Sequence, residues 1–556
     1  RRQRQMCIRD RFIMTLLCLS LWGGKAFSAE WQWSVPVTAA VSDETGGHPQ
    51  AFLWVPPSCN RVKALVVGQH NMCEETLFEN PLFRREMEEA GIALVWISPI
   101  LDFPWDVTNG CNDALLEALD SLAEVSGYSE LAYAPIVPLG HSAMATFPWN
   151  FAAWNPERTL AVVSYHGDAP RTNLTGYGRA NLEWGRTRNI DGIPGLMIEG
   201  EYEWWEARVR PALAFRMMYP QSCISFLCDA GRGHFDVSDR TARYIALFLK
   251  KALEWRLPEM SGDGPVKLKQ VNPKDGWLAE RWRRGDDIEG ETRLPAPSRQ
   301  PKRPRPAPYG AYKGDPHDAF WYFDREMAEL TESIYREERG KQPQYLCFVQ
   351  DGKLLSYDEK AHQRVAARFL PEADGLTFCL KAVYTDSTYR SVTERHAAVS
   401  PTITRICGPV EQLDDTTFRV SFYRMGLYNR KRTGSITLLA ASPGDRHYKS
   451  TVQELSFNIP YRNTEGKRQH ILFPGLPDVE FGIDTLSLDA TSDCGLPVSY
   501  YVKEGPAEIV GNKLVFTSIP PRSRFPLKVT VVAWQYGLTG RVQTAEPVER
   551  SFYIVR

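Results

Sequence analysis

The sequence lacks a charge excess of either sign, an apolar run of transmembrane length and a dense set of cysteines. Its 66 Lys and Arg balance 67 Asp and Glu, so neither nucleic acid nor an anionic membrane is expected as the main partner. Eleven cysteines in 556 residues are too few for a scaffold built on disulfides. No CxxC or His-rich spacing occurs, so we expect no structural zinc and no metal or other cofactor.

What is present suffices for several folded domains. Hydrophobic residues make up 43% of the chain and aromatic residues 12%, which provides for buried cores and excludes global disorder. At about 150 residues per domain the length predicts three or four domains. We place a leader at 1–29, an α/β domain at 30–257, a linker region at 258–310, a helix with a β-sandwich at 311–467, and a last β domain at 468–556.

The amino terminus carries a short apolar run, Phe12–Trp22, preceded by arginines and followed by small residues. The run is too short to span a bilayer but is typical of a secretory signal peptide, with cleavage after Ser28 or Ala29. The alternative is a buried first helix. Residues 1–10 look extraneous, and no later run reaches the length of a transmembrane helix. Export would permit disulfides, with Cys73–Cys111 and Cys347–Cys379 as possible pairs that spacing alone does not assign.

Short apolar runs alternate with amphipathic patterns from Lys63 to about Leu253. Continuous apolar strands alternating with helices predict a parallel sheet covered on both faces. The expected strands are Ala64–Gly68, Ala93–Ile97, Ile136–Leu139, Leu160–Ser164, Leu196–Ile198 and Ile224–Leu227, and the expected helices are Pro81–Ala90, Asp113–Ser126, Ala143–Ala153, Trp205–Met218 and Ser238–Trp255.

The second half of the chain changes character. Arg293–Pro308 has six prolines and five basic residues without an apolar period, which is typical of an extended linker; a nucleic-acid tail is the weaker alternative. Asp318–Arg339 has the pattern of an amphipathic helix. The runs that follow predict a β-sandwich: Gln344–Gln350, Leu376–Tyr384, Thr417–Tyr423 and Ser435–Ala440.

Five short strands near the carboxyl terminus have an immunoglobulin-like rhythm: Thr485–Ala490, Val498–Val502, Lys513–Phe516, Leu527–Trp534 and Val548–Val555. The stretch LDATSDCGLPVSYYVKEGPAEIVGNKLVFT, followed by KVTVVAWQYG and AEPVERSFYIV, resembles the bacterial Ig-like repeats of secreted and cell-surface proteins. That resemblance implies a bacterial, extracytoplasmic protein, periplasmic, secreted or at the cell surface, in which this module is a spacer or presentation module rather than a catalyst.

A serine follows the third predicted strand and opens a helix, in Gly140-His141-Ser142-Ala143. A sharp strand-to-helix turn projects such a hydroxyl above the sheet edge, where the Ala143 N–H can stabilise an oxyanion. Met144 departs from the glycine usual two residues after the nucleophile. Alone, Ser142 could equally be a helix cap.

An acid and then a histidine follow the fifth and sixth predicted strands, Leu196–Ile198 and Ile224–Leu227, in the required order. The chain resembles the α/β-hydrolase superfamily over about Val37–Leu257, and the resemblance implies a nucleophile Ser142, a base His234 and an orienting acid Glu203, with Glu201 as runner-up. In isolation, His234 could be a surface-loop residue and the glutamates a solvated helix start. His166 follows a middle strand, in the wrong order for the base.

The loop after the first predicted strand of this domain should supply a second oxyanion donor, the N–H of Asn71 or Met72. Candidates for the substrate pocket are His70, His141, Trp149, Trp204 and Trp205, with packing as the alternative for each.

The sequence therefore predicts an exported serine carboxylesterase with a Ser-His-Glu triad, followed by β-sandwich and Ig-like modules. Acetyl or feruloyl esters of polysaccharides are the candidate substrates, by analogy of architecture only. A lipase or peptidase with the same triad is the nearest alternative. The other is a non-catalytic surface binding protein on a hydrolase scaffold.

Overall fold

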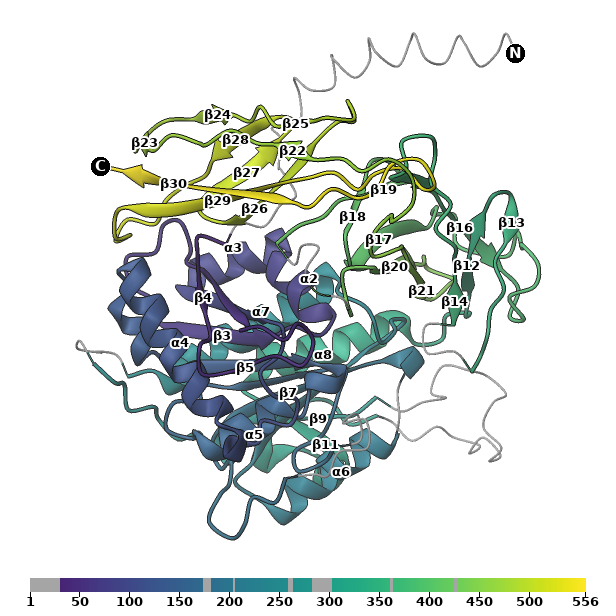
Figure 1. Cartoon of the computed structure of the whole chain (residues 1–556). Coiled ribbons are helices and arrows are strands. Elements are labelled where there is room, and N and C mark those ends of the chain that lie inside the picture. Colours follow the sequence, from purple (N-terminus) through teal and green to yellow (C-terminus); the bar gives the residue numbers. More distant parts are fainter. Residues whose placement is uncertain are drawn as a thin grey trace.

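The computed structural model describes residues 31–173, 182–203, 206–258, 264–282, 303–360, 364–424, 429 and 431–556. The expected signal peptide and its cleavage site lie outside these residues, as do Trp204, Trp205 and most of the proline-rich stretch. Figure 1 shows an α/β body, in purple to teal, with two β-rich parts in green and yellow packed along it. Among the described residues, no helix is long and apolar enough to cross a bilayer.

An eight-stranded sheet forms the centre of the α/β body, in the order β1-β2-β4-β3-β5-β6-β7-β8. The pairs β1–β2 and β2–β4 are antiparallel and all later pairs are parallel. The six predicted strands are present as β3 to β8, whereas β1 and β2 were not predicted. The bounds are β1 Trp33–Pro36, β2 Gln50–Trp54, β3 Ala64–Gln69, β4 Ile92–Ser98, β5 Ile136–His141, β6 Val162–Tyr165, β7 Pro194–Gly200 and β8 Cys223–Asp229.

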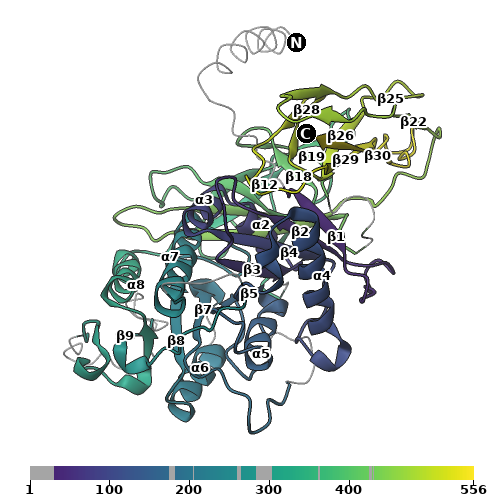
Figure 2. The ribbon, with the colours of Figure 1, turned by 90° about the vertical axis from the view of Figure 1, so that its left-hand side faces the viewer.

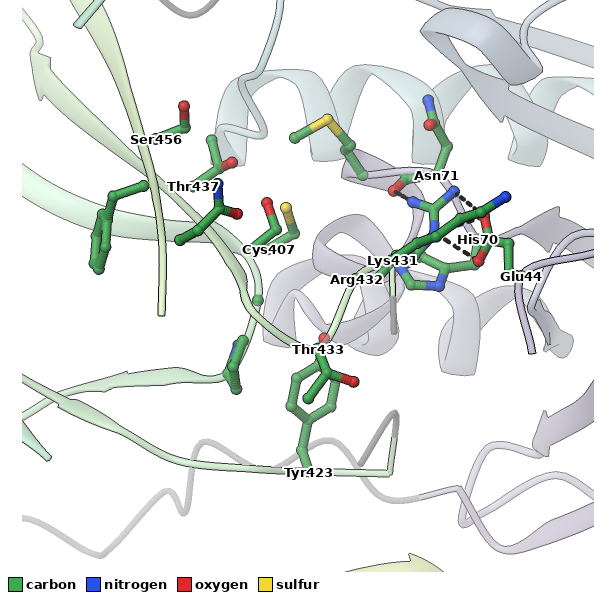
Figure 3. Close-up of a pocket in the computed structure, with 16 residues that line it drawn as sticks. Glu44, His70, Asn71, Cys407, Tyr423, Lys431, Arg432, Thr433, Thr437 and Ser456 are labelled. Atoms are coloured by element: carbon green, nitrogen blue, oxygen red, sulfur yellow. Dashed lines mark hydrogen bonds and ion pairs between the residues drawn. The ribbon is translucent and has the colours of Figure 1, made fainter. Parts of the chain in front are cut away.

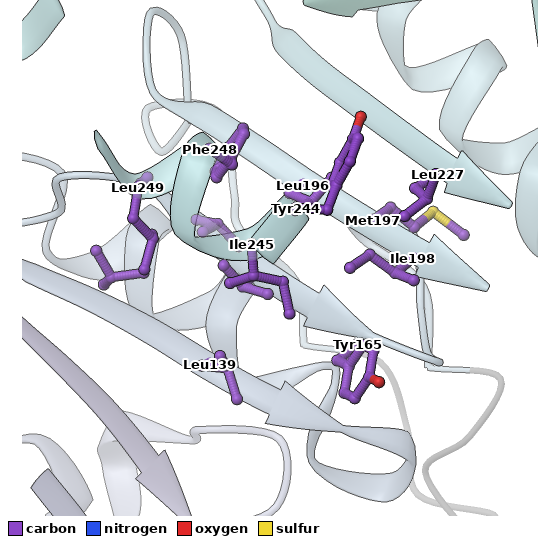
Figure 4. Packing of buried hydrophobic residues seen from close by; sticks show 14 of the residues in the cluster. Leu139, Tyr165, Leu196, Met197, Ile198, Leu227, Tyr244, Ile245, Phe248 and Leu249 are labelled. Atoms are coloured by element: carbon purple, nitrogen blue, oxygen red, sulfur yellow. The ribbon is translucent and has the colours of Figure 1, made fainter. Parts of the chain in front are cut away.

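Helices cover both faces of this sheet. Apolar residues of α3 and α7 belong to the core on one face, and those of α4 to the core on the other (Figure 2). Tyr244, Ile245, Phe248 and Leu249, one face of α7, pack on β5 to β8 (Figure 4). The helices are α2 Cys73–Glu79, α3 Pro81–Ala90, α4 Cys111–Ser126, α5 Phe147–Trp154, α6 Glu206–Met218 and α7 Asp239–Arg256. This is the α/β-hydrolase fold, as the resemblance implies.

The helix expected over Asp318–Arg339 is shorter than predicted. Its first part is a buried strand, β11 Ala319–Tyr322, and α8 Arg325–Glu338 begins only after Asp324, whose carboxylate accepts the Met327 N–H. β11 pairs with β9 Trp277–Glu280, and the Ser225 hydroxyl of β8 donates to the Trp321 carbonyl. These elements therefore extend the core of the α/β body, while the domain boundaries themselves stay a prediction.

The following residues form a β-sandwich whose apolar core also includes Val532 and Trp534 of the carboxyl-terminal domain. Its sheets have the orders β13-β12-β16, β14-β21-β20-β17 and β15-β19-β18. The bounds are β12 Tyr345–Gln350, β13 Lys353–Leu354, β14 Val365–Ala366, β15 Thr377–Cys379, β16 Lys381–Thr385, β17 Thr402–Cys407, β18 Val410–Gln412, β19 Thr417–Val420, β20 Ser435–Ser442 and β21 Thr451–Asn458.

The carboxyl-terminal domain is a second sandwich, with a four-stranded sheet β23-β30-β29-β26 and a three-stranded sheet β24-β28-β27. All five strands predicted here are present, which confirms the all-β class. Arg522 of this domain lies 3.1 Å from the Glu130 carboxylate of the α/β body. The bounds are β23 Val479–Glu480, β24 Thr485–Ser487, β26 Ser499–Glu504, β27 Ala507–Val510, β28 Lys513–Phe516, β29 Leu527–Trp534 and β30 Val548–Val555.

All nine cysteines of the described residues are free thiols, so the two possible disulfides are wrong for this structure. Cys73 belongs to the core on one face of the central sheet and Cys111 to the core on the other. Cys347 is buried in the sandwich, where its thiol contacts the Leu355 carbonyl, whereas Cys379 is exposed.

Candidate active site

Ser142 lies on a strained turn between β5 and α5. The turn is a single 3-10 segment, η3 Ser142–Met144, and Ser142 has a positive φ of 53°. Serine rarely adopts this conformation, and such strain is commonly found at functional sites. The turn closes so tightly that a Cβ on Gly140 would collide with the Met144 carbonyl. Met144 itself fits because its side chain is buried in the core of one sheet face.

Replacing Gly140 by alanine is expected to destabilise the protein by at least about 1–3 kcal/mol, because the added methyl group meets backbone that has no room to move. Gly310→Ala is the matched control, since a Cβ there meets no atom within 4 Å. Urea unfolding of both variants measures the difference. Equal stability of the two would show that the turn relaxes without loss.

The structure brings together the three residues that the sequence puts forward as a triad. His234 lies in the loop after β8, and its Nε2 is 2.7 Å from the Ser142 Oγ. Its Nδ1 contacts the carboxylate of Glu203, the last residue of the turn η4 Glu201–Glu203 after β7. A carboxylate only accepts, so Nδ1 carries the proton and Nε2 is free to accept from the Ser142 hydroxyl.

Glu201, the alternative acid, is engaged elsewhere. Its carboxylate accepts the Gly231 N–H at 2.7 Å and pairs with Lys449 Nζ at 2.5 Å. Burial acts to raise the pKa of Glu203, but the charges and hydrogen bonds of His234 and His166 hold that pKa well below its usual range. Glu203 is therefore an ionised carboxylate at neutral pH.

His166 is a second histidine on the same carboxylate. It follows β6 with a φ of 50°, is fully buried, and its Nδ1 contacts the other oxygen of Glu203. Burial acts to lower the pKa of His166, yet Glu203 raises it above the ordinary value. The position of His166, directly after a strand of the same sheet, is the one sequence signal for this contact. Chain order shows only that His166 is wrongly placed for the base, not that it contacts the acid.

His141 contacts the backbone of the loop that carries His234. Burial, followed by the charges of His234 and His166, lowers its pKa well below the usual value, so the ring is neutral. Its Nε2 lies 2.9 Å from the His234 carbonyl and must donate to it, since a carbonyl only accepts. His141 thus contacts the backbone of the proposed base rather than a pocket.

The loop after β3 approaches the serine turn through side chains and backbone. The Asn71 amide donates to the His141 carbonyl at 2.8 Å. The Met72 N–H donates to the Glu74 carboxylate at 3.0 Å, and the His141 N–H donates to the other Glu74 oxygen at 2.7 Å. Because Met72 is engaged in this way, the N–H groups of Ala143 and Asn71 are the better candidates for the oxyanion.

No sequence pattern points to Glu74. Its burial predicts that the stability of the protein depends on pH. Burial raises its pKa to about 7, against about 4.3 in an unfolded chain. The stability that this raised pKa contributes is fully present below about pH 4.3 and is lost as pH rises through 7. Glu74→Gln removes the titration, so the Tm of the variant relative to wild type should rise by about 2–4 °C between pH 5 and 8.

Thermal melts across this pH range check the result. Glu157→Gln, on an exposed turn, serves as the control and should run parallel to wild type. If the Glu74→Gln and wild-type curves also stay parallel, the carboxyl does not titrate in this range.

No family model matches the sequence, and no curated protein matches it. Among solved structures, a dienelactone hydrolase from Anabaena variabilis is 16% identical, with 40% of this chain and 98% of that chain covered and a TM-score of 0.27. An esterase from the archaeon Pyrobaculum calidifontis is 16% identical, with 44% and 92% covered and a TM-score of 0.29. Est1E from Butyrivibrio proteoclasticus is 14% identical, with 39% and 96% covered and a TM-score of 0.25. The likeness is one of fold.

Of the remaining candidates for the substrate pocket, the structure describes Trp149 and His70. Trp149 is buried, its indole N–H donates to the Asp168 carbonyl at 2.7 Å, and its ring fills the space beside Gly195 of β7. Trp149 is therefore a core residue. His70 is also buried, 3.0 Å from the Ser98 hydroxyl, and burial lowers its pKa well below the usual value, but it also lines a cavity beside the loop after β3. Trp204 and Trp205 lie outside the described residues.

The β-sandwich covers the site, which the sequence did not predict. The Tyr202 hydroxyl donates to the Ser450 carbonyl at 2.8 Å, and the half-buried Glu454 of β21 accepts the N–H of Phe235, next to His234. Ser142 retains only 5% exposure under this cover. Within the described residues, no group of three or more His, Cys, Asp and Glu is arranged to hold a metal ion.

Proposed function

We propose that this chain is a serine hydrolase that cleaves carboxylic esters through Ser142, His234 and Glu203. The observation that carries the proposal is the 2.7 Å approach of His234 Nε2 to Ser142 Oγ, with Glu203 on the far ring nitrogen. A nucleophile, a base and an orienting acid within hydrogen-bond reach are the arrangement that acyl transfer requires.

In the first half of the reaction, His234 Nε2 takes the proton of Ser142 as Oγ attacks the ester carbonyl. The oxyanion that forms is stabilised by the N–H groups of Ala143 and Asn71. Glu203 keeps the proton on Nδ1 and stabilises the imidazolium. His234 then protonates the leaving alcohol, and the acyl group remains on Ser142.

In the second half, water attacks the acyl-enzyme after His234 removes its proton. The carboxylic acid leaves as His234 returns that proton to Ser142 Oγ. The ionised state of Glu203, held by two histidines, keeps the base correctly oriented throughout.

Export and the identity of the ester belong to the same proposal. Two sequence features support a location outside the cytoplasm: the signal-peptide pattern at Phe12–Trp22 and the resemblance of the last domain to Ig-like repeats. The protein would then be periplasmic, attached to the cell surface or secreted. Ester groups on polysaccharides are the proposed substrates, an inference from architecture.

A fluorophosphonate probe tests the proposal directly. Ser142 Oγ should displace fluoride to form a stable Oγ–P bond, with its proton passing to His234. Intact-mass measurement should find one adduct on the wild type and none on Ser142→Ala. A wild type that is neither labelled nor able to hydrolyse short-chain nitrophenyl esters would instead support a non-catalytic binding protein.

A further inference from the structure

A cavity of about 450 Å³ lies between the α/β body and the β-sandwich. One wall is the loop His70-Asn71-Met72, and the other comes from the strands β17, β20 and β21. Figure 3 shows Ser456, Thr437 and Cys407 on the sandwich side, facing Asn71 across the space. The volume falls within the roughly 300–1,000 Å³ of small-molecule sites.

The sandwich wall is rich in neutral hydrogen-bonding groups. Thr433, Ser435 and Thr437 come from β20 and the turn before it, and Ser456 and Asn458 from β21. A hydroxyl both donates and accepts, and an amide offers two donors and an acceptor. Such a wall matches a ligand whose own groups are hydroxyls. An apolar acyl chain offers no hydrogen bond to such a wall.

Three charged groups line the cavity: Glu44 and Arg432 pair with each other, and Lys431 adds one positive charge. Arg432 lies 2.9 Å from the Glu44 carboxylate and donates to the Asn71 carbonyl at 2.6 Å (Figure 3). Burial acts to raise the pKa of Glu44, yet the hydrogen bonds and charge of Arg432 hold that pKa below its usual value. Arg432 therefore anchors the loop, so that the hydroxyl and amide groups, together with Lys431, are the groups that face a ligand.

The same loop connects the cavity to the proposed nucleophile. Asn71 lines the cavity, and its side-chain amide donates to the carbonyl of His141, the residue before Ser142. Asn71 therefore belongs both to the cavity wall and to the set of contacts that hold the turn of Ser142.

We propose that this cavity binds the sugar portion of the ester substrate, so that the β-sandwich selects glycosyl esters for the triad. This inference rests on the proposed function. It assigns recognition to sandwich residues from Cys407 onward, at least 265 positions after Ser142 in the chain (407 − 142 = 265). The chemical class of ligand is a polyhydroxylated ring.

The test compares two esters of equal ring size, an O-acetylated methyl glucoside and cyclohexyl acetate. The ratio of their kcat/KM values should favour the sugar in wild type. Ser456→Ala and Thr437→Val each remove one hydroxyl and should lower the ratio about 3- to 10-fold. Thr404→Val, on an exposed position of β17, is the matched control and should keep the wild-type ratio.

Binding of methyl glucoside to Ser142→Ala, measured by calorimetry with and without Ser456→Ala, separates this inference from the proposed function. If the wild type hydrolyses neither ester but sugar binding to Ser142→Ala still weakens with Ser456→Ala, the cavity's ligand is supported while the proposed function fails. Ester hydrolysis with an unchanged ratio in both cavity variants would overturn the cavity assignment and leave the triad intact.

Discussion

Replacing Ser142 by alanine is expected to lower kcat/KM for 4-nitrophenyl acetate by about 10³- to 10⁶-fold, because no other group at the turn can form the acyl-enzyme. The residual rate would reflect water attack aided by the oxyanion donors and substrate binding alone. Initial rates at known enzyme concentration measure the loss. The variant should fold, because the Ser142 hydroxyl contacts the His234 side chain. Neither the 3-10 turn η3 nor the helix α5 depends on a side-chain cap from Ser142.

The control is a serine whose hydroxyl donates to a backbone carbonyl and not to a histidine. Ser333 of α8 donates to the Leu330 carbonyl and lies outside the proposed machinery. Ser333→Ala should keep the wild-type rate, so any common effect of serine loss is accounted for. If Ser142→Ala retains a tenth or more of wild-type activity, another nucleophile performs the reaction.

Ser142, Glu203 and His234 could be proposed from the sequence because each follows an apolar strand of one parallel sheet. The carboxyl ends of such strands meet at one edge, so chain order alone indicates which side chains converge. The structure places all three there. The fold class could be predicted for the same reason: strands buried on both faces leave continuous apolar runs.

Other features left no comparable signal. Arg432 and Glu454 reach the site from a domain far along the chain, and a contact across so many residues has no periodicity to reveal it. The run AFWY of β11 reads as the start of a helix in the sequence, because it directly precedes the amphipathic pattern of α8. β1 and β2 are short and pair antiparallel, outside the α/β alternation that carried the prediction.

Glu203→Gln is expected to lower kcat by about 10⁴-fold. The wild-type carboxylate accepts from the Nδ1 of both His234 and His166, each through its own oxygen. A glutamine has one accepting oxygen and one donating NH₂ group, so one of the two histidines must change tautomer or lose its partner. A change at His234 would protonate Nε2 and leave no base for Ser142. The loss of charge also removes the stabilisation of the imidazolium.

Steady-state kinetics of Glu203→Gln beside Glu201→Gln test which carboxylate has this role. Glu201 is two residues away on the same turn but pairs with Lys449, so its amide variant should stay within about tenfold of wild type. Glu203→Asp keeps the charge on a shorter side chain and should fall between the two. If Glu201→Gln caused the large loss and Glu203→Gln the small one, the acid would be Glu201 and the sandwich contact through Lys449 would have to open during turnover.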